Sequence, residues 1–108
     1  ALSRGRAAAV IVTLGAEGAL AFRGAEAWRV PALKLDRVVD TTGAGDAFAG
    51  ALAAALELGM GWTDALARAS AAGGLACTKQ GAQPALPRAQ EIDAALARLG
   101  PVVRIDAN

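Results

Sequence analysis

The sequence contains no histidine and a single cysteine, Cys77. One cysteine cannot form an internal disulfide. Without histidine there is no His/Cys metal cluster and no Ser-His or Cys-His nucleophile pair. Many hydrolase mechanisms are excluded on these grounds.

The sequence also lacks an excess of one charge and any long apolar run. Lysine and arginine number 11 against 10 acidic residues, for a net charge of +1, and the basic residues are scattered. This argues against nucleic acid or a membrane surface as a main partner. The longest apolar runs, residues 7–14 and 47–56, are too short to span a bilayer, and no signal peptide is visible. We expect a cytoplasmic location.

The N-terminal half has the pattern of short strands. Residues 8–13 form a continuous apolar run, which predicts a buried strand. Burial on both faces would need neighbouring segments that this chain does not supply, and we expect such neighbours. Residues 14–18 read as a turn and residues 19–22 as a second strand, which together favour a meander. Residues 27–30 and 35–39 predict two more strands, with Pro31 at an edge or bend between them.

The C-terminal half has the pattern of helices. Residues 44–58 carry small and branched apolar side chains and few charges, which predicts a helix buried nearly all round and ended by Gly59. Thr63 is expected to cap a second helix, residues 64–77. A third helix, residues 88–99, follows Pro87 and ends at Gly100-Pro101. The tail, residues 102–108, has no predicted place.

Small residues mark one face of the second predicted helix. Its inward residues are Leu66, Ala69, Gly73 and Ala76, and residues 71–74 read AAGG. Such a surface allows tight helix packing, or the close approach of a flat ring such as adenine. Both interpretations stay open. The third helix is expected to turn Ile92, Leu96 and Leu99 inward.

The most informative segment is residues 40–50, DTTGAGDAFAG. A glycine-rich turn at a helix N-terminus presents backbone amides and the positive end of the helix dipole, which favour a phosphate; here these are the amides of Gly43, Ala44 and Gly45. Asp46 would then stand beside the anion, where a carboxylate can activate an attacking hydroxyl. Alternatively, Asp46 caps a helix and the glycines only turn the chain.

Three segments together resemble a known family. DTTGAGDAFAG, VTLGAEG at residues 12–18 and TKQGAQPALP at residues 78–87 are similar, in order and spacing, to motifs of the ribokinase-like sugar kinases, the phosphofructokinase-B family. The resemblance spans residues 9–99. It implies an α/β fold with three α/β/α layers and a predominantly parallel central sheet. Members of that family are roughly two to three times longer. The resemblance therefore implies that the chain is the C-terminal nucleotide-binding and catalytic-base portion of one domain, without the sugar-binding part and lid, and the lack of an initiator Met agrees with this expectation.

The resemblance also implies roles for individual residues. Asp46 would contact the sugar and take the proton from its attacking hydroxyl, and the turn of Gly43, Ala44 and Gly45 would form the anion hole. The implied nucleotide-binding residues are Thr13, Leu14, Gly15, Ala16, Glu17, Gly18, Gly45, Asp46 and Ser70. Read alone, residues 13–18 are equally consistent with a hairpin turn, and Ser70 with a solvated helix serine.

A monovalent cation, K⁺, is implied beside the anion hole. The matching positions, which would act mainly through backbone oxygens, are Asp40, Thr42, Ala76, Lys79, Gly81 and Ala85. Ala85 departs from the pattern because many ribokinases have a hydroxyl residue there. Asp40 is equally compatible with an Asx-type cap.

The implied reaction is phosphorylation of a sugar hydroxyl by ATP with Mg²⁺. GAQP at residues 81–84 favours ribokinase, which makes ribose 5-phosphate from D-ribose, whereas Ala49 stands where many ribokinases carry Asn. The alternatives are a kinase for fructose, 2-keto-3-deoxygluconate or a nucleoside, and a non-catalytic nucleotide-binding fragment. We expect the isolated chain to be inactive. A homodimer of the full-length protein stays open.

Overall fold

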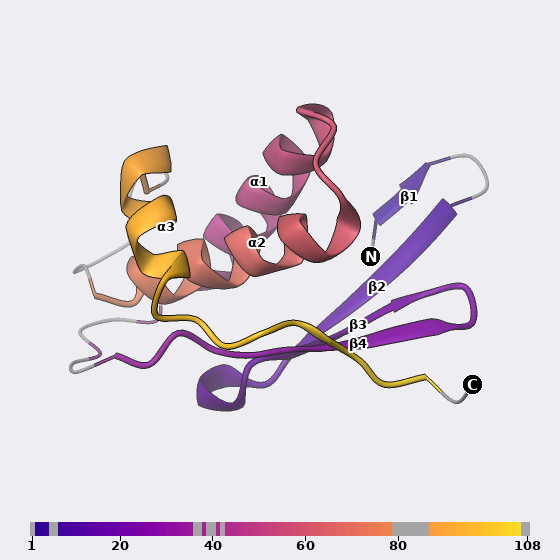
Figure 1. Ribbon diagram of the computed structural model, residues 1–108, viewed down its shortest axis with the longest axis horizontal. Helices are drawn as coiled ribbons and strands as arrows, with labels where there is room; N and C mark the ends of the chain where they lie inside the picture. The colour runs from indigo at the N-terminus through magenta and orange to yellow at the C-terminus, as the bar shows by residue number, and fades with distance from the viewer. Residues whose placement is uncertain are drawn as a thin grey trace.

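The computed structural model describes residues 2–4, 7–35, 38, 41, 43–78 and 87–106. Three helices lie over one face of a single sheet (Figure 1), which confirms the expected α/β class. The elements in chain order are β1 (Leu2–Arg4), β2 (Ala7–Thr13), the 3₁₀ turn η1 (Gly15–Glu17), β3 (Ala19–Arg23), β4 (Glu26–Val30), α1 (Ala44–Glu57), α2 (Trp62–Ala76), α3 (Ala89–Leu96) and β5 (Val103–Arg104).

The strand order is β1-β2-β3-β4-β5, and each neighbouring pair is antiparallel. The predicted meander is confirmed, whereas the predominantly parallel sheet is not found among the described residues. The connections explain the difference: β3 and β4 are joined through Gly24-Ala25, and β2 and β3 through residues 14–18. Parallel neighbours need a crossover of about a dozen residues or more.

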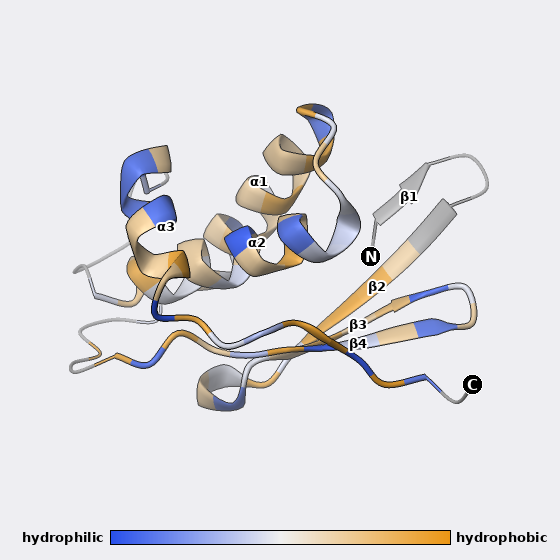
Figure 2. Ribbon diagram, viewed as in Figure 1, coloured by the Kyte–Doolittle hydropathy of each residue, from blue (hydrophilic) through white to orange (hydrophobic). Residues whose placement is uncertain are grey.

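One face of the sheet is covered by helices and the other is open. On β2, Ala9 is buried, whereas Val10 and Val12 are 46% and 43% exposed. Phe22 pairs with Val10 across β2 and β3 and is also exposed. Figure 2 shows β2 as a mainly hydrophobic strand. Both faces of β2 are thus apolar, but the helices in the described part of the chain cover only one of them, and the neighbours expected over the other face are not part of the described residues.

The ends of the sheet differ from the prediction. β4 ends at Val30, before Pro31, which has no N–H to donate to a strand. In the predicted strand of residues 35–39, Leu35 and Val38 belong to no strand, and the other positions lie outside the described residues. Two short edge strands, β1 and β5, were not predicted.

The core lies between the sheet and the helices. Trp28 and Val30 of β4 pack with Phe48 and Leu52 of α1 and Leu66 of α2. The buried residues of α1 recur at helical spacing on one side, Ala47, Phe48, Ala51, Leu52 and Ala55. Its other side is exposed at Ala53, Ala54 and Leu56. The prediction that α1 is buried nearly all round is therefore wrong for the described residues.

The caps of α2 and α3 also differ from the prediction. Gly61, in an extended conformation, is the N-cap of α2, so Thr63 lies inside the first turn and is not the cap. The inward face of Leu66, Ala69, Gly73 and Ala76 is confirmed as buried. α3 starts after Arg88, whose N–H donates to the Glu91 carboxylate at 2.9 Å, and its last residue is Leu96. Ile92 is buried as expected.

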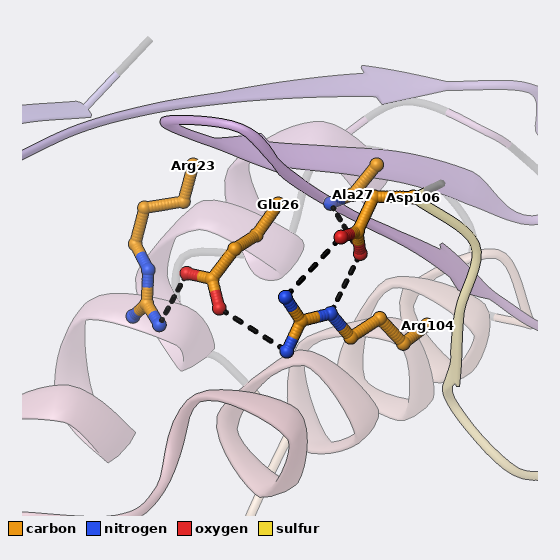
Figure 3. Close-up of polar contacts among 5 residues, drawn as sticks. All are labelled: Arg23, Glu26, Ala27, Arg104 and Asp106. Atoms are coloured by element: carbon orange, nitrogen blue, oxygen red, sulfur yellow. Dashed lines mark hydrogen bonds and ion pairs between the residues drawn. The ribbon is translucent and has the colours of Figure 1, made fainter. Parts of the chain in front are cut away.

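A polar network ties β5 to β4 (Figure 3). The Arg104 guanidinium pairs with Asp106 at 2.6 Å and with Glu26 at 3.4 Å. Glu26 also pairs with Arg23, and Asp106 accepts a hydrogen bond from the Ala27 N–H at 3.3 Å. The hydrogen bond from Arg104 lowers the pKa of Asp106 below its ordinary value. These contacts hold residues 104–106 along the sheet.

Candidate active site

A cleft of about 820 Å³ opens between the start of α1, the C-terminal half of α2, the loop after β2 and the segment after β4. This volume lies in the range of small-molecule sites, roughly 300–1,000 Å³. The lining residues are Thr13, Gly15, Ala16, Gly18, Ala19, Ala32, Leu33, Lys34, Leu35, Val38, Thr41, Ala44, Gly45, Phe48, Ser70, Gly73, Gly74 and Cys77.

The loop of residues 13–18 forms one rim of the cleft. The Leu14 N–H donates to the Gly18 carbonyl at 2.7 Å, and the Gly18 N–H donates to the Gly15 carbonyl at 3.1 Å. Both glycines have positive φ, 61° and 98°. Thr13, Gly15, Ala16 and Gly18 line the cleft, whereas the exposed residues Leu14 and Glu17 are not among its lining residues.

The N-terminus of α1 forms the opposite rim. Gly43 is the N-cap with a left-handed backbone, φ 84°, and its carbonyl accepts the Ala47 N–H at 2.9 Å. The Ala44 N–H donates to the Thr41 carbonyl at 3.2 Å, so this amide is engaged within the turn. Ala44 and Gly45 line the cleft. The next amides of the first turn, those of Gly45 and Asp46, have no acceptor one helical turn earlier within α1.

Asp46 is exposed in the first turn of α1, directly after Gly45. It is not among the lining residues of the cleft, although its neighbour Gly45 is. Among the described residues, no group of three or more His, Cys, Asp or Glu side chains could hold a metal ion. Lys34 is the one charged residue that lines the described cleft.

The glycines of α2 let the walls of the cleft approach each other. A Cβ at Gly73 would lie 3.3 Å from the Ala44 carbonyl oxygen, and a Cβ at Gly74 would lie 2.8 Å from Cβ of Leu33. The packing interpretation of these small residues is therefore supported. Both glycines also line the cleft.

Ser70 lies on α2 and lines the cleft. Its side chain is 8% exposed, and its hydroxyl donates to the Pro31 carbonyl at 2.5 Å. The alternative of a solvated helix serine is therefore wrong, because the hydroxyl is buried and bonded to protein.

The predicted cation site is largely outside the described residues, which do not include Asp40, Thr42, Lys79, Gly81 and Ala85. Ala76 is described: it is 7% exposed, at the last position of α2, and is not among the lining residues of the cleft.

Several lining residues were not predicted from the sequence, above all Ala32, Leu33 and Lys34. The only feature of the sequence near them is Pro31, which indicates where β4 ends but not that the following residues line a cleft. Phe48 and Cys77 also line the cleft, and apolar periodicity assigned them only to helices.

The motifs of this cleft recur in proteins of known function. Residues 1–89 match the model of the pfkB family carbohydrate kinases. The chain belongs to this family. The expected resemblance is confirmed, and with it the ribokinase-like α/β fold, since solved ribokinases superpose on most of the chain. The expected parallel sheet is not confirmed among the described residues.

Individual relatives show how far the likeness extends. A ribokinase of Lactococcus lactis is 42% identical over 90 residues, which are 83% of this chain and 30% of the relative. Fructokinase-1 of rice is 42% identical over 94 residues, covering 77% of this chain and 28% of the relative. The structure of Arabidopsis thaliana ribokinase complexed with ribose and ATP is 35% identical with a TM-score of 0.75, covering 82% of this chain and 28% of that protein. The chain thus spans less than a third of their length.

Proposed function

We propose that the protein containing this chain transfers the γ-phosphoryl group of ATP to a sugar hydroxyl, with D-ribose as substrate and ribose 5-phosphate as product. The proposal rests on the cleft, which brings together three parts of the chain. These are the glycine loop of residues 13–18, the N-terminus of α1 and the face of small residues on α2. Each of these elements holds one of the residues predicted to bind the nucleotide, Gly15, Gly45 and Ser70.

The cleft suits a nucleotide in size and in lining. Apolar side chains and glycine backbone can pack against a purine ring, and the helix N-terminus offers amides to phosphate oxygens. In this proposal residues 13–18 and the part of α2 that carries Ser70 surround the nucleotide, while Gly43, Ala44 and Gly45 form the turn at the transferring phosphoryl group. The Gly45 and Asp46 amides would donate to that group, since the Ala44 amide already has a partner.

Asp46 is proposed as the catalytic base. Its carboxylate, exposed beside the glycine turn, would orient the sugar hydroxyl and accept its proton as the oxygen attacks the γ-phosphorus. General-base assistance of this kind contributes about 10²- to 10⁴-fold in rate. The rest of the acceleration would come from positioning and from donors aimed at the phosphoryl oxygens.

Metal ions complete the proposal. Mg²⁺ would be held mainly by the ATP phosphates and water, with few protein carboxylates. K⁺ would bind beside the anion hole through the positions Asp40, Thr42, Ala76, Lys79, Gly81 and Ala85. Its charge would offset that of the phosphates and fix the turn.

Ribose is the proposed substrate because a ribokinase matches at 42% identity over most of the chain. The rice fructokinase, at the same identity, favours fructose as the second candidate. The described residues include no membrane-spanning helix, and we place the proposed reaction in the cytoplasm. The isolated chain is proposed to be inactive, since sugar recognition would require further residues.

The test is ADP release by the full-length gene product with Mg²⁺ and ATP. Ribose, fructose, 2-keto-3-deoxygluconate and adenosine are compared, each with and without K⁺. Ribose-dependent, K⁺-stimulated release supports the proposal. ADP release with another sugar would make that sugar the substrate in place of ribose. If no sugar gives ADP release, a non-catalytic nucleotide-binding protein is favoured.

A further inference from the structure

Residues 31–35 form a wall of the cleft although they belong to no strand or helix. Four consecutive residues of this wall, Ala32 to Leu35, line the cleft. The chain has left the β-ladder at Val30, so the strand pairing that fixes β4 does not extend to the wall. The backbone carbonyls of such a segment need donors from elsewhere.

Two side chains from different helical regions supply these donors. The Ser70 hydroxyl, from α2, donates to the Pro31 carbonyl at 2.5 Å. The Arg98 guanidinium, just after α3, donates to the Lys34 carbonyl at 3.3 Å. One bond lies at each end of the wall, and Arg98 is exposed and does not line the cleft.

Backbone contacts fix the wall between these two bonds. A Cβ at Gly74 would lie 2.8 Å from Leu33 Cβ, and a Cβ at Gly18 would lie 3.1 Å from the Ala32 nitrogen. Leu33 is itself 5% exposed. The wall therefore fits closely between the glycine loop and α2.

We propose that Ser70 is a positioning residue: it holds the wall of residues 31–35 through the Pro31 carbonyl, and Arg98 holds the same wall at Lys34. The Ser70 hydroxyl proton is committed to Pro31, so Ser70 acts on a ligand in the cleft through the wall. The effect on ATP rests on the proposed function, whereas the effect on the wall itself does not.

Hydrogen exchange without nucleotide tests the structural half in the full-length protein. Ser70→Ala and Arg98→Ala are expected to speed exchange of the amides of residues 32–35, since each leaves a carbonyl without its donor. Arg68→Ala is the matched control, because Arg68 pairs with Asp93 on α3 and does not touch the wall. Unchanged exchange in both test variants overturns the proposal, whatever the activity.

Steady-state kinetics tests the proposed effect of the wall on ATP binding. Ser70→Ala should raise KM for ATP about three- to tenfold, for the loss of a part-buried hydrogen bond. Arg98→Ala should raise it by a smaller factor, about two- to threefold, because its hydrogen bond is exposed. In both variants kcat and the sugar KM should stay within about twofold. The double variant should show less than the product of the two effects, because both act on one wall. If Ser70→Ala alone raises KM for ATP, Ser70 contacts the nucleotide directly and the proposal fails.

The remaining outcomes are also decisive. If Ser70→Ala lowers kcat and raises KM for both ATP and the sugar to a similar extent, the variant has a general structural defect, which overturns the positioning role. If Ser70→Ala does not fold, the surface variant Arg98→Ala decides by the same two measurements. A wild-type protein that does not bind ATP refutes the proposed function, while the exchange result still decides the role of Ser70.

Discussion

Gly18 packs directly against the carbonyl oxygen of Val30, where β4 ends. A Cβ at position 18 would overlap this oxygen, and the residue has a φ of 98°, which side chains rarely adopt. Gly15, in the same loop, also has positive φ, but a Cβ there meets nothing within 4 Å. The loop therefore requires glycine at 18 for space and at 15 only for backbone conformation.

Gly18→Ala should lower the free energy of unfolding by about 2–4 kcal/mol, from overlap plus backbone strain. Gly15→Ala should cost about 1–2 kcal/mol, from backbone strain alone. Urea denaturation of the full-length variants measures both. Equal losses of unfolding free energy in the two variants would mean that the close contact with Val30 is not what requires glycine at position 18.

Gly45→Ala separates stability from activity. The position is in the first turn of α1 and a Cβ there meets nothing within 4 Å, so the fold should keep or gain about 0.5–1 kcal/mol from the better helix former. If phosphate approaches this backbone, the added methyl group should still lower kcat about tenfold or more. Gly61→Ala, at the equally open N-cap of α2, is the control and should leave kcat unchanged. Full activity of Gly45→Ala would place the phosphate elsewhere.

Asp46→Asn should reduce turnover about 10²- to 10⁴-fold and leave nucleotide affinity within a few-fold, because the base acts in the transition state. Asp64→Asn is the matched control: Asp64 is also exposed in the first turn of its helix, α2. Both variants lose a favourable charge at a helix N-terminus, worth about 0.3–1 kcal/mol. Steady-state kinetics and nucleotide titration compare them. Similar turnover in the two variants would mean that Asp46 contributes only its negative charge at the helix N-terminus.

Asp106 should make stability depend on pH in the acid range. Its pKa is lowered in the folded protein, first by the hydrogen bond from Arg104, from an ordinary value of 3.8. The stabilisation is therefore complete above about pH 4–5, where the unfolded aspartate is also ionised, and is lost as pH falls through the folded pKa. Asp106→Asn should lower the melting temperature slightly at pH 7 and make no difference at the acid end. Thermal melts across this range measure the effect, and a deficit that persists in acid would contradict it.

The local elements could be predicted because local chemistry determines them. Apolar runs separated by glycine predicted β2, β3 and β4, and the DTTGAGD turn predicted the start of α1. The sheet direction was taken from the whole family fold, whereas the short connections of this chain, such as Gly24-Ala25, produce antiparallel pairs. β1 and β5 have too few residues to show a period and are set by pairing at the edges of the sheet.

The candidate site was predictable only where it has a motif. Glycines 15, 18 and 45 stand in recognisable turns, and the structure brings them to one cleft. The wall of residues 31–35 has no motif, because its place is set by contacts with residues far along the chain, Ser70 and Arg98. Sequence periodicity carries no information on such contacts.

In the proposed reaction the phosphoryl group passes from ATP to a sugar, and phosphorus NMR can follow this group directly. Phosphorus NMR of the full-length protein with ATP, Mg²⁺, K⁺ and D-ribose should show a new phosphomonoester on the 5-hydroxyl, formed in step with ADP. Release of inorganic phosphate in place of the ester, or an unchanged ATP spectrum with every sugar, would contradict the account.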